Sequence, residues 1–275
     1  LTAAGAIVPA GGGRSIFALP WLGRTLIGTT DNDYDPDLPL EHIPPSDEDI
    51  GYLLDATNSY FATDLGPQDI TGAYAGVRPL ISTGDPKKSV DISRKAELYE
   101  TSSGMITITG GKLTTFRRMA KMTVDRLVER DARDAPCRTH EIPLGQPIDP
   151  ADLPRIEGVR DEAYGALAAR YGHAAHDVLA IAAERGELAQ PIVGDLPDVL
   201  AEAVYAARSE QALSLSDVLL RRTRIGLLAG RELLAGDALD RVAAATGAEL
   251  GWDTARVAEE TVEFRTEAVA EGIAP

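Results

Sequence analysis

The sequence predicts an α+β protein whose strands come first and whose helices come last. Short runs rich in β-branched and aromatic residues, separated by Gly and Pro, continue to about residue 135. A stretch rich in Pro, Gly and Asp follows without periodicity, and the remainder is Ala-rich with apolar residues at helical spacing. These observations predict a strand-rich part at 1–137, a linker at 138–154 and a helical domain at 155–275.

Strand and helix signals alternate in the first part. The β-prone runs 15–20 and 25–30 are separated by Trp-Leu-Gly-Arg, which indicates a hairpin. Gly11-Gly12-Gly13 is interpreted as a flexible turn. Ser46 can cap a helix, because acids at 47–49 would lie in its first turn, where the helix dipole favours them. Further elements are expected as strands at 70–74, 96–100 and 105–109 and as a helix at 113–130.

The second part is predicted to be a bundle of five or six helices. Apolar residues recur every three to four positions in 162–171, 176–185, 197–211, 216–234, 238–246 and 254–270. Start signals precede three of these segments at Asp195, Ser216 and Asp253. Stop signals are the glycines Gly172, Gly186, Gly236, Gly247 and Gly272.

Composition excludes several classes of protein. The 275 residues are 44% hydrophobic and carry 27 basic against 43 acidic side chains, a formal charge of -16. The apolar content excludes a disordered chain, and no apolar run is long enough for a membrane span. The acidity argues against a nucleic-acid partner, because phosphate binding needs clustered Lys and Arg. Cys137 is the single cysteine, which excludes an internal disulfide and favours a reducing compartment.

Cationic residues next to glycines are the informative feature of the strand-rich part. Arg78 precedes a proline, which favours an extended backbone, and Arg94 follows in a loop. Gly110-Gly111-Lys112-Leu113-Thr114-Thr115 ends a strand and opens a helix, where N–H groups attract anions. Together these residues could bind a phosphate or a carboxylate, and solvated surface charges are the alternative interpretation.

Other constellations are poorer candidates, and no metal site is expected. His173 and His176 stand three residues apart without a third ligand of suitable spacing. The alternating acids Asp31, Asp33, Asp35 and Asp37 lack the glycine of a calcium loop, so a solvated loop is expected. Cys137 is interpreted as an inert loop thiol, and no Gly-x-Gly-x-x-Gly dinucleotide fingerprint is present.

Four segments of the sequence resemble a known family. They are Phe17-Ala18-Leu19-Pro20-Trp21, Ile27-Gly28-Thr29-Thr30-Asp31, Tyr74-Ala75-Gly76-Val77-Arg78-Pro79-Leu80 and Gly110-Gly111-Lys112-Leu113-Thr114-Thr115-Phe116-Arg117. In order and spacing they resemble the FAD-dependent, respiratory glycerol-3-phosphate dehydrogenases. The tail, with 202–208 and 217–224, is similar to that family's C-terminal helical domain. The family's N-terminal half, which carries the dinucleotide fingerprint, has no counterpart.

The resemblance implies a fold, a reaction and residue roles. The fold would be a partial flavoprotein domain of the D-amino-acid-oxidase type with a substrate-binding sheet, followed by the helical domain. The reaction would be oxidation of glycerol 3-phosphate by FAD, with electrons passed to a quinone. Arg78 and Lys112 would be catalytic, and Arg78, Arg94 and Thr115 would bind substrate. The residues beside the flavin would be Gly110, Gly111, Lys112, Leu113 and Thr114.

Further expectations follow from the same resemblance. The chain begins at Leu1 without a signal-peptide pattern, so it is expected to be an excised piece. Because half of the family's flavin site would be absent, this piece is expected to be inactive alone. The location would be cytoplasmic, and the resemblance leaves open peripheral membrane association and a homodimer. No general base is identifiable. Thr29 and Thr30 would lie near the site.

Two alternatives remain open at this point. A related flavin amine or amino-acid oxidoreductase would use the same arginines to hold a carboxylate. A non-catalytic interaction module would use the acidic helical tail to dock a partner, and in that case the residues from about 155 onward would fold and bind alone.

Overall fold

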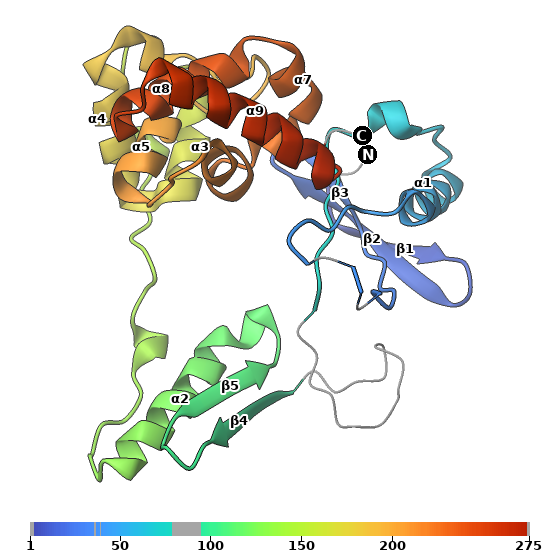
Figure 1. Ribbon diagram of the computed structural model, residues 1–275, viewed down its shortest axis with the longest axis vertical. Helices are drawn as coiled ribbons and strands as arrows, with labels where there is room; N and C mark the ends of the chain where they lie inside the picture. Colours follow the sequence, from blue (N-terminus) through green and yellow to red (C-terminus); the bar gives the residue numbers. More distant parts are fainter. Residues whose placement is uncertain (1–2, 36, 39, 79–94, 274–275) are drawn as a thin grey trace. The chain divides into compact units, whose positions relative to one another are not determined.

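The computed structural model describes residues 3–35, 37–38, 40–78 and 95–273 (Figure 1). The chain divides into two compact units. The first takes in Leu1–Thr30, Pro39–Gly76 and Gln146–Pro275, and the second takes in Asp31–Leu38 and Val77–Gly145. The last change of unit lies inside the segment predicted as a linker. The domain boundaries placed at 137 and 155 stay a prediction.

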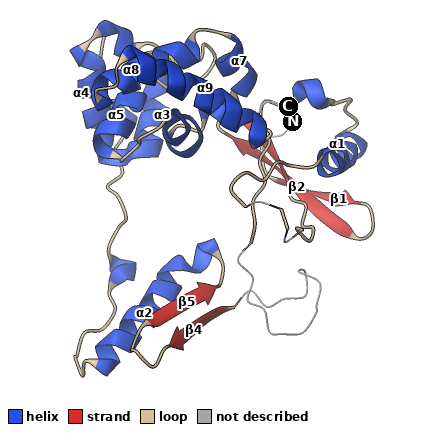
Figure 2. Cartoon of the chain, in the orientation of Figure 1, coloured by secondary structure: helices blue, strands red, loops and turns tan. Residues whose placement is uncertain are grey.

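The first unit begins with a three-stranded antiparallel sheet in the order β1-β2-β3 (Figure 1). Figure 2 draws strands in red and helices in blue. Its strands are β1 (Ala6–Ala10), β2 (Arg14–Trp21) and β3 (Arg24–Gly28). The predicted hairpin is confirmed, and its turn places Leu22 and Gly23 at φ 49° and 78°, as tight hairpin turns require. Strand β1 was not predicted, because the short Ala-Ile-Val-Pro-Ala run has a weak strand propensity.

Helix α1 (Asp47–Phe61) packs against this sheet. As predicted, Ser46 caps the helix, and its hydroxyl oxygen accepts a hydrogen bond from the Asp49 N–H at 3.1 Å. The apolar side chains between helix and sheet include Val8, Ile16, Ala18, Tyr52, Leu53, Ala56 and Phe61. Burial of this small cluster fixes the helix on one face of the sheet.

The second unit contains a hairpin packed against one helix. Its elements are β4 (Ala96–Glu100), β5 (Ile106–Gly110), a 3-10 turn (Leu113–Thr115) and α2 (Phe116–Arg130). They confirm the strands predicted at 96–100 and 105–109 and the helix predicted at 113–130. None of the residues described in this unit is fully buried. A two-stranded hairpin with one helix is near the lower limit of independent stability, so the described part of this unit has no hydrophobic core of its own.

The strand predicted at 70–74 is wrong. The Thr71 carbonyl accepts a hydrogen bond from the Gly230 N–H at 3.3 Å, and the Thr71 hydroxyl donates to the Leu227 carbonyl at 3.4 Å. Both groups therefore bond to the C-terminal helical region and not to a neighbouring strand. Local β propensity at 70–74 yields to this tertiary contact.

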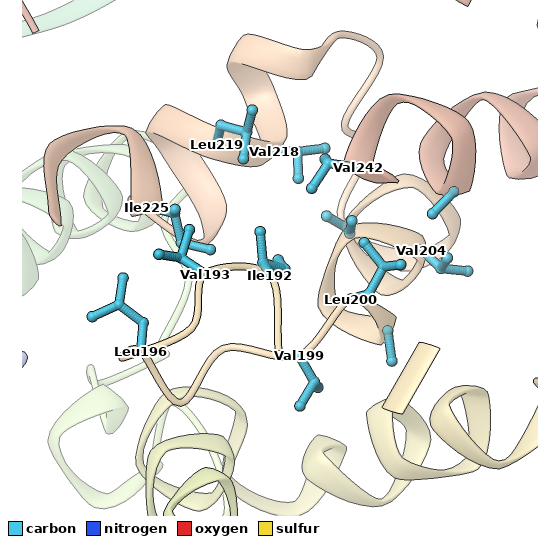
Figure 3. Packing of buried hydrophobic residues seen from close by; sticks show 14 of the residues in the cluster. Ile192, Val193, Leu196, Val199, Leu200, Val204, Val218, Leu219, Ile225 and Val242 are labelled. Carbon is cyan, nitrogen blue, oxygen red and sulfur yellow. The ribbon is translucent and has the colours of Figure 1, made fainter. Parts of the chain in front are cut away.

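The rest of the first unit is a helical domain with one large core (Figure 3). Its helices are α3 (Asp161–Tyr171), α4 (Ala175–Glu184), α5 (Ala201–Ser209), α6 (Ile225–Leu228), α7 (Gly230–Ala235), α8 (Ala238–Leu250) and α9 (Thr254–Ala270). Short 3-10 turns of the first unit lie at Pro67–Asp69, Pro150–Asp152, Gly172–Ala174 and Gly186–Ala189, and a further one at Thr139–Glu141 belongs to the second unit. The all-helical character of this part is confirmed. The bounds of α9 match the prediction, and Asp253 caps it by accepting from the Arg256 N–H at 2.8 Å.

The single helix predicted over 216–234 is wrong. A π-helical turn at Asp217–Arg222 is followed by the two short helices α6 and α7. Arg224 has a left-handed backbone with φ 64°, and Ala229 has φ -152°, so the helix is interrupted twice. Apolar periodicity does not reveal these breaks, because the segments on either side of each break keep buried apolar faces.

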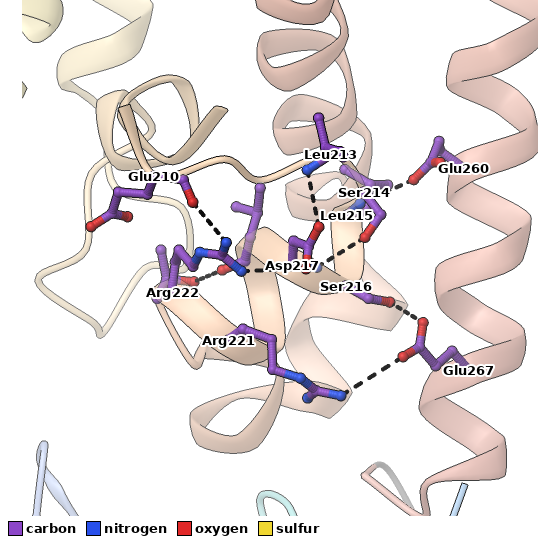
Figure 4. A network of polar contacts seen from close by, with 12 residues as sticks. Glu210, Leu213, Ser214, Leu215, Ser216, Asp217, Arg221, Arg222, Glu260 and Glu267 are labelled. Carbon is purple, nitrogen blue, oxygen red and sulfur yellow. Dashed lines mark hydrogen bonds and ion pairs between the residues drawn. The ribbon is translucent and has the colours of Figure 1, made fainter. Parts of the chain in front are cut away.

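Polar contacts with α9 hold the π-helical turn in place (Figure 4). The Glu260 carboxylate accepts from the Leu215 N–H at 3.0 Å, and the Glu267 carboxylate accepts from the Ser216 hydroxyl. Asp217 accepts from the Leu213 N–H at 3.0 Å. Ser216 therefore bonds to α9 and does not cap the segment that follows it.

Two other helix boundaries differ from the predictions. Helix α5 begins at Ala201 and not at 197, because Pro191 and Val199 form an antiparallel bridge before it. Asp195 consequently pairs with Arg24 at 2.9 Å and does not cap a helix. Helix α8 continues past Gly247 to Leu250 and is capped by Gly251, whose φ of 71° is the left-handed conformation that favours glycine.

A cluster of ionisable groups is buried beside α3 and α5. The Arg170 guanidinium lies 2.6 Å from Asp198 Oδ1 and also pairs with Glu202. Glu202 accepts hydrogen bonds from the Tyr171 hydroxyl at 3.0 Å and the Val199 N–H at 2.9 Å. Burial raises the pKa of Glu202 to about 7, opposed by Arg170 and assisted by Asp198. One arginine thus faces two buried carboxylates, and the cluster takes up a proton near neutral pH.

The helical domain is expected to lose stability as the pH rises through 7. Because the pKa of Glu202 is raised from 4.5 to about 7 on folding, the stabilisation is complete below pH 4.5 and is lost as the pH reaches 7. The loss is on the order of 3 kcal/mol. Urea denaturation across this pH range measures it. The variant Glu202→Gln should show a correspondingly flatter pH dependence, and an unchanged slope would remove Glu202 as its source.

Candidate functional site

Arg78, the first residue of the candidate site, is oriented by an acid. Its Nη1 donates to Asp31 Oδ2 at 2.8 Å, and the two side chains are 40% and 27% exposed. An ion pair this exposed contributes at most about 1 kcal/mol to stability, so its main effect is to direct the guanidinium. Sequence reasoning treats Asp31 as part of a solvated loop and misses this contact. The sequence signal that could have indicated this contact is the position of Asp31 at the end of the 27–31 motif.

The Gly-Gly-Lys turn has the geometry of a rigid corner between β5 and α2. Gly110 and Gly111 have φ 70° and 75°, which strains any other residue. A Cβ on Gly111 would also stand 2.5 Å from Met119 Sδ. Thr115 Oγ1 accepts from the Lys112 N–H at 3.2 Å and donates to the Lys112 carbonyl at 2.8 Å. The hydroxyl of Thr115 therefore closes the turn.

The outer surface of this corner is open. Lys112 and Thr114 are exposed, and the Leu113 side chain is 90% exposed. Within the described ranges, no carboxylate pairs with the Lys112 ammonium. An exposed apolar side chain next to an ammonium provides both an apolar contact and a point charge for a ligand.

The convergence of the predicted site residues stays a prediction. Arg78 and the 110–115 turn belong to the same compact unit. Between these two parts of the described chain, no hydrogen bond or ion pair joins Arg78 to Lys112 or Thr115. Arg94 lies outside the described residues.

The structure also describes the contacts of the acidic stretch, the histidine pair and the single cysteine. Asp35 accepts from the Asp37 N–H at 2.9 Å, so the acidic stretch forms a local turn. The rings of His173 and His176 lie 5.0 Å apart in an edge contact. Cys137 Sγ lies 3.3 Å from Thr139 Oγ1, and this hydrogen bond lowers the pKa of the thiol.

A three-residue group of metal-ligand type lies elsewhere in the described chain. It consists of His42, Glu267 and Glu271, whose ligand atoms lie within 4.8 Å of one another. Arg221 Nη2 lies 3.3 Å from Glu271 Oε1, so a guanidinium already pairs with one of these two acids. Among the helices that the structure describes, none combines the length and apolar character needed to cross a bilayer.

Two family models match the chain. The model described as "FAD dependent oxidoreductase" matches residues 2–126, which include the sheet, Arg78 and the Gly-Gly-Lys turn. The model described as "C-terminal domain of alpha-glycerophosphate oxidase" matches residues 105–257, which include most of the helical domain. The two matches together cover both the candidate site and the helical region.

Similar curated proteins carry one name. Glycerol-3-phosphate dehydrogenase 1 of Mycobacterium tuberculosis is 41% identical over 222 residues, which is 78% of this chain and 42% of the relative. Glycerol-3-phosphate dehydrogenase of Synechocystis sp. is 38% identical over 232 residues, 78% of this chain and 40% of the relative. The mitochondrial enzyme of Bos taurus is 35% identical over 262 residues, 90% of this chain and 35% of the relative.

The chain therefore spans less than half the length of these relatives. The two family matches and the order of helices and strands agree on a flavoprotein-type first part and a helical second part. The chain belongs to the FAD-dependent oxidoreductases that carry the C-terminal domain of the glycerophosphate oxidase type.

Proposed function

We propose that this chain serves in the FAD-dependent oxidation of sn-glycerol 3-phosphate to dihydroxyacetone phosphate, with electrons passed to a quinone. The observation that carries the proposal is the oriented guanidinium of Arg78 in the unit that also presents Lys112 on a glycine corner. The names of the similar proteins and the two family matches support the same substrate.

The residues at the glycine corner fit a flavin ring. The left-handed backbone of Gly110 and Gly111 carries no side chain, and the adjacent Lys112 and Leu113 side chains are exposed. A planar ring can lie against such a backbone, and an ammonium beside it stabilises negative charge. In this proposal Gly110, Gly111, Lys112, Leu113 and Thr114 hold the flavin.

Further polypeptide is needed to complete this site. The described part of the second unit contains no fully buried side chain, and the chain spans less than half of its relatives. We therefore expect the 275-residue chain to be inactive alone. The longer flavoprotein would be cytoplasmic and peripheral at the membrane that carries its quinone, and a homodimer is part of the same proposal.

The chemistry divides between the cofactor and this chain. FAD bound at this corner would supply the hydride acceptor for the secondary carbinol carbon of glycerol 3-phosphate. The hydroxyl group on that carbon gives its proton to a base. The positive charge of Lys112 stabilises the negative charge that develops on the hydroxyl oxygen. Arg78 and Arg94 bind the phosphate dianion, because a guanidinium donates two parallel hydrogen bonds to two oxygens. Thr115 contributes to substrate binding from the closed turn.

Flavin bleaching tests the proposal. The full-length flavoprotein that contains this chain is expected to be yellow and to lose its visible flavin absorbance when glycerol 3-phosphate is added without an electron acceptor. Glycerol and inorganic phosphate serve as separate controls and should leave the spectrum unchanged. A colourless full-length protein would contradict the cofactor, and bleaching by an amino acid in place of glycerol 3-phosphate would favour the amine or amino-acid oxidoreductase alternative.

A further inference from the structure

The chain enters the helical domain through a segment that packs against α3. We call this segment, residues 146–156, the strap, and all of it belongs to the first unit. At its beginning, the Gln146 carbonyl accepts a hydrogen bond at 2.8 Å from the N–H of His173, just beyond the end of α3. At its end, the Ile156 N–H donates to the hydroxyl oxygen of Tyr164 at 2.8 Å. The strap is therefore attached to α3 at two separate points.

The attachment at Gln146 depends on Gly172, the residue that ends α3. A Cβ added to Gly172 would lie 2.3 Å from the Gln146 carbonyl oxygen, closer than real Cβ atoms approach. Because the obstructing atom is backbone, a rotamer change cannot relieve the contact. Gly172 also has φ 55° and ψ -132°, a conformation that glycine adopts far more readily than other residues. The strap and the end of α3 thus fit together closely, and displacement of the last turn of α3 would break the contact.

The same last turn of α3 carries two donors of the buried ionisable cluster. Arg170 and Tyr171 directly precede Gly172 in the sequence. The Arg170 guanidinium pairs with Glu202 and lies 2.6 Å from Asp198 Oδ1, and the Tyr171 hydroxyl donates to Glu202 at 3.0 Å. These contacts hold the end of α3 against α5 and the segment before it. The turn that fixes the strap is thus itself fixed by side chains that bond to buried acids.

The charge of this cluster changes near neutral pH. Two buried carboxylates face one guanidinium, so ionisation of both leaves an uncompensated negative charge away from water. Glu210 adds a further carboxylate that acts on Tyr171, and Arg222, which donates to the Glu210 carbonyl at 2.7 Å, opposes it. Burial raises the pKa of Glu202 to about 7, so this acid loses its proton as the pH rises through neutrality.

We propose that the buried cluster and the strap form a proton-sensitive switch: the last turn of α3 holds the strap at Gln146 while Glu202 carries a proton, and it opens when Glu202 is ionised. Opening lets water reach the excess negative charge, which offsets the loss of the hydrogen bond and the packing. The pH then sets how much of the chain ahead of α3 is free. This inference concerns the first unit alone, so it stands or falls independently of the proposed substrate and cofactor.

Amide hydrogen exchange of the full-length flavoprotein between pH 5 and pH 8, resolved to single residues, tests the switch. Each rate is divided by the intrinsic rate of that amide at the same pH. For the His173 amide this ratio should rise about tenfold per pH unit up to pH 7 and then level off, because the pKa of Glu202 is raised from 4.5 to about 7 on folding. The Ile156 amide, at the other attachment, should keep a constant ratio. Equal pH dependence at both amides would overturn a local opening at Gln146.

Glu202→Gln identifies the group that triggers the opening. The amide cannot ionise near neutral pH, so the exchange ratio at His173 should stay low up to pH 8. Glu260→Gln is the matched control, because Glu260 is equally buried, accepts from the Leu215 N–H at 3.0 Å and pairs with Arg256, but lies on α9. It should leave the rise at His173 unchanged. A rise that persists in Glu202→Gln would overturn the switch, and the comparison of the two amides in the parent protein needs no variant.

Gly172→Ala tests the attachment itself, because it separates the strap from α3 without changing a charge. The exchange ratio at His173 should be raised already at pH 5, where the parent protein keeps the strap attached. Gly165→Ala is the control within the same helix, since a Cβ on Gly165 meets no atom within 4 Å. It should leave the ratio at His173 unchanged. Equal ratios in the two variants at pH 5 would overturn the attachment of the strap by the end of α3.

Discussion

Replacement of Arg78 by lysine is expected to lower kcat/KM for glycerol 3-phosphate about 100-fold in the full-length flavoprotein. Lysine keeps the positive charge but loses the planar pair of donors that binds two phosphate oxygens. It also loses the geometry of the contact with Asp31, which holds the guanidinium at 2.8 Å. Steady-state kinetics with flavin content measured in parallel tests this expectation.

Arg126→Lys is the control for that experiment. Arg126 belongs to the same unit and pairs with Glu100 at 2.8 Å, but it lies on α2 outside the predicted site residues. Its replacement should leave kcat/KM within about twofold of the parent value. Equal kinetics for Arg78→Lys and the parent enzyme would remove Arg78 from the site.

The second large effect concerns stability. Arg170→Met should destabilise the helical domain by about 3–5 kcal/mol at pH 8, because it leaves Asp198 and Glu202 buried without their cation. The side chains of these two acids are only 1% and 2% exposed, so water cannot replace the guanidinium. Chemical denaturation measures the loss. Because Glu202 can take up a proton, the destabilisation should be smaller at about pH 5 than at about pH 8.

Arg208→Met is the matched control for the buried cluster. Arg208 also pairs with two carboxylates, Glu184 and Glu249, at 2.9 and 2.8 Å, but its side chain is 39% exposed. Solvent screens such a pair, so its loss should cost no more than about 1 kcal/mol. Similar losses for Arg170→Met and Arg208→Met would contradict the special role of burial.

Much of the fold could be predicted because local signals agreed with tertiary structure. The Ser46 cap, the β2–β3 hairpin and the α9 helix each combine a terminal signal with the correct periodicity. Predictions failed where a segment with clear periodicity bonds to a distant one. The segment 70–74 forms no strand and bonds to α6, and the segment predicted as one helix at 216–234 is interrupted at Arg224 and Ala229 while its start bonds to α9.

The candidate site was predictable in residue type but not in detail. The adjacency of glycines and cations in the sequence pointed to Arg78, Lys112 and the 110–115 turn. Asp31 could not be assigned, because it lies 47 positions from Arg78 and its pairing depends on the folded chain. Gly111 has a packing role that the sequence did not indicate, since its missing Cβ makes room for Met119, and its predicted place beside the flavin stays a prediction.

The sequence by itself determined the order of the two parts and the family, and it predicted the types of residue that would serve a flavin and a phosphate. Only the tertiary structure decided that the Leu227 carbonyl of α6 would accept a hydrogen bond from Thr71. It also decided that Arg170 would pair with Asp198 and Glu202. Periodicity and capping act over a few residues, so they depend on side chains that are neighbours in the sequence. Long-range hydrogen bonds and the burial of one segment against another depend on which surfaces pack together. No local sequence pattern indicates which surfaces these are.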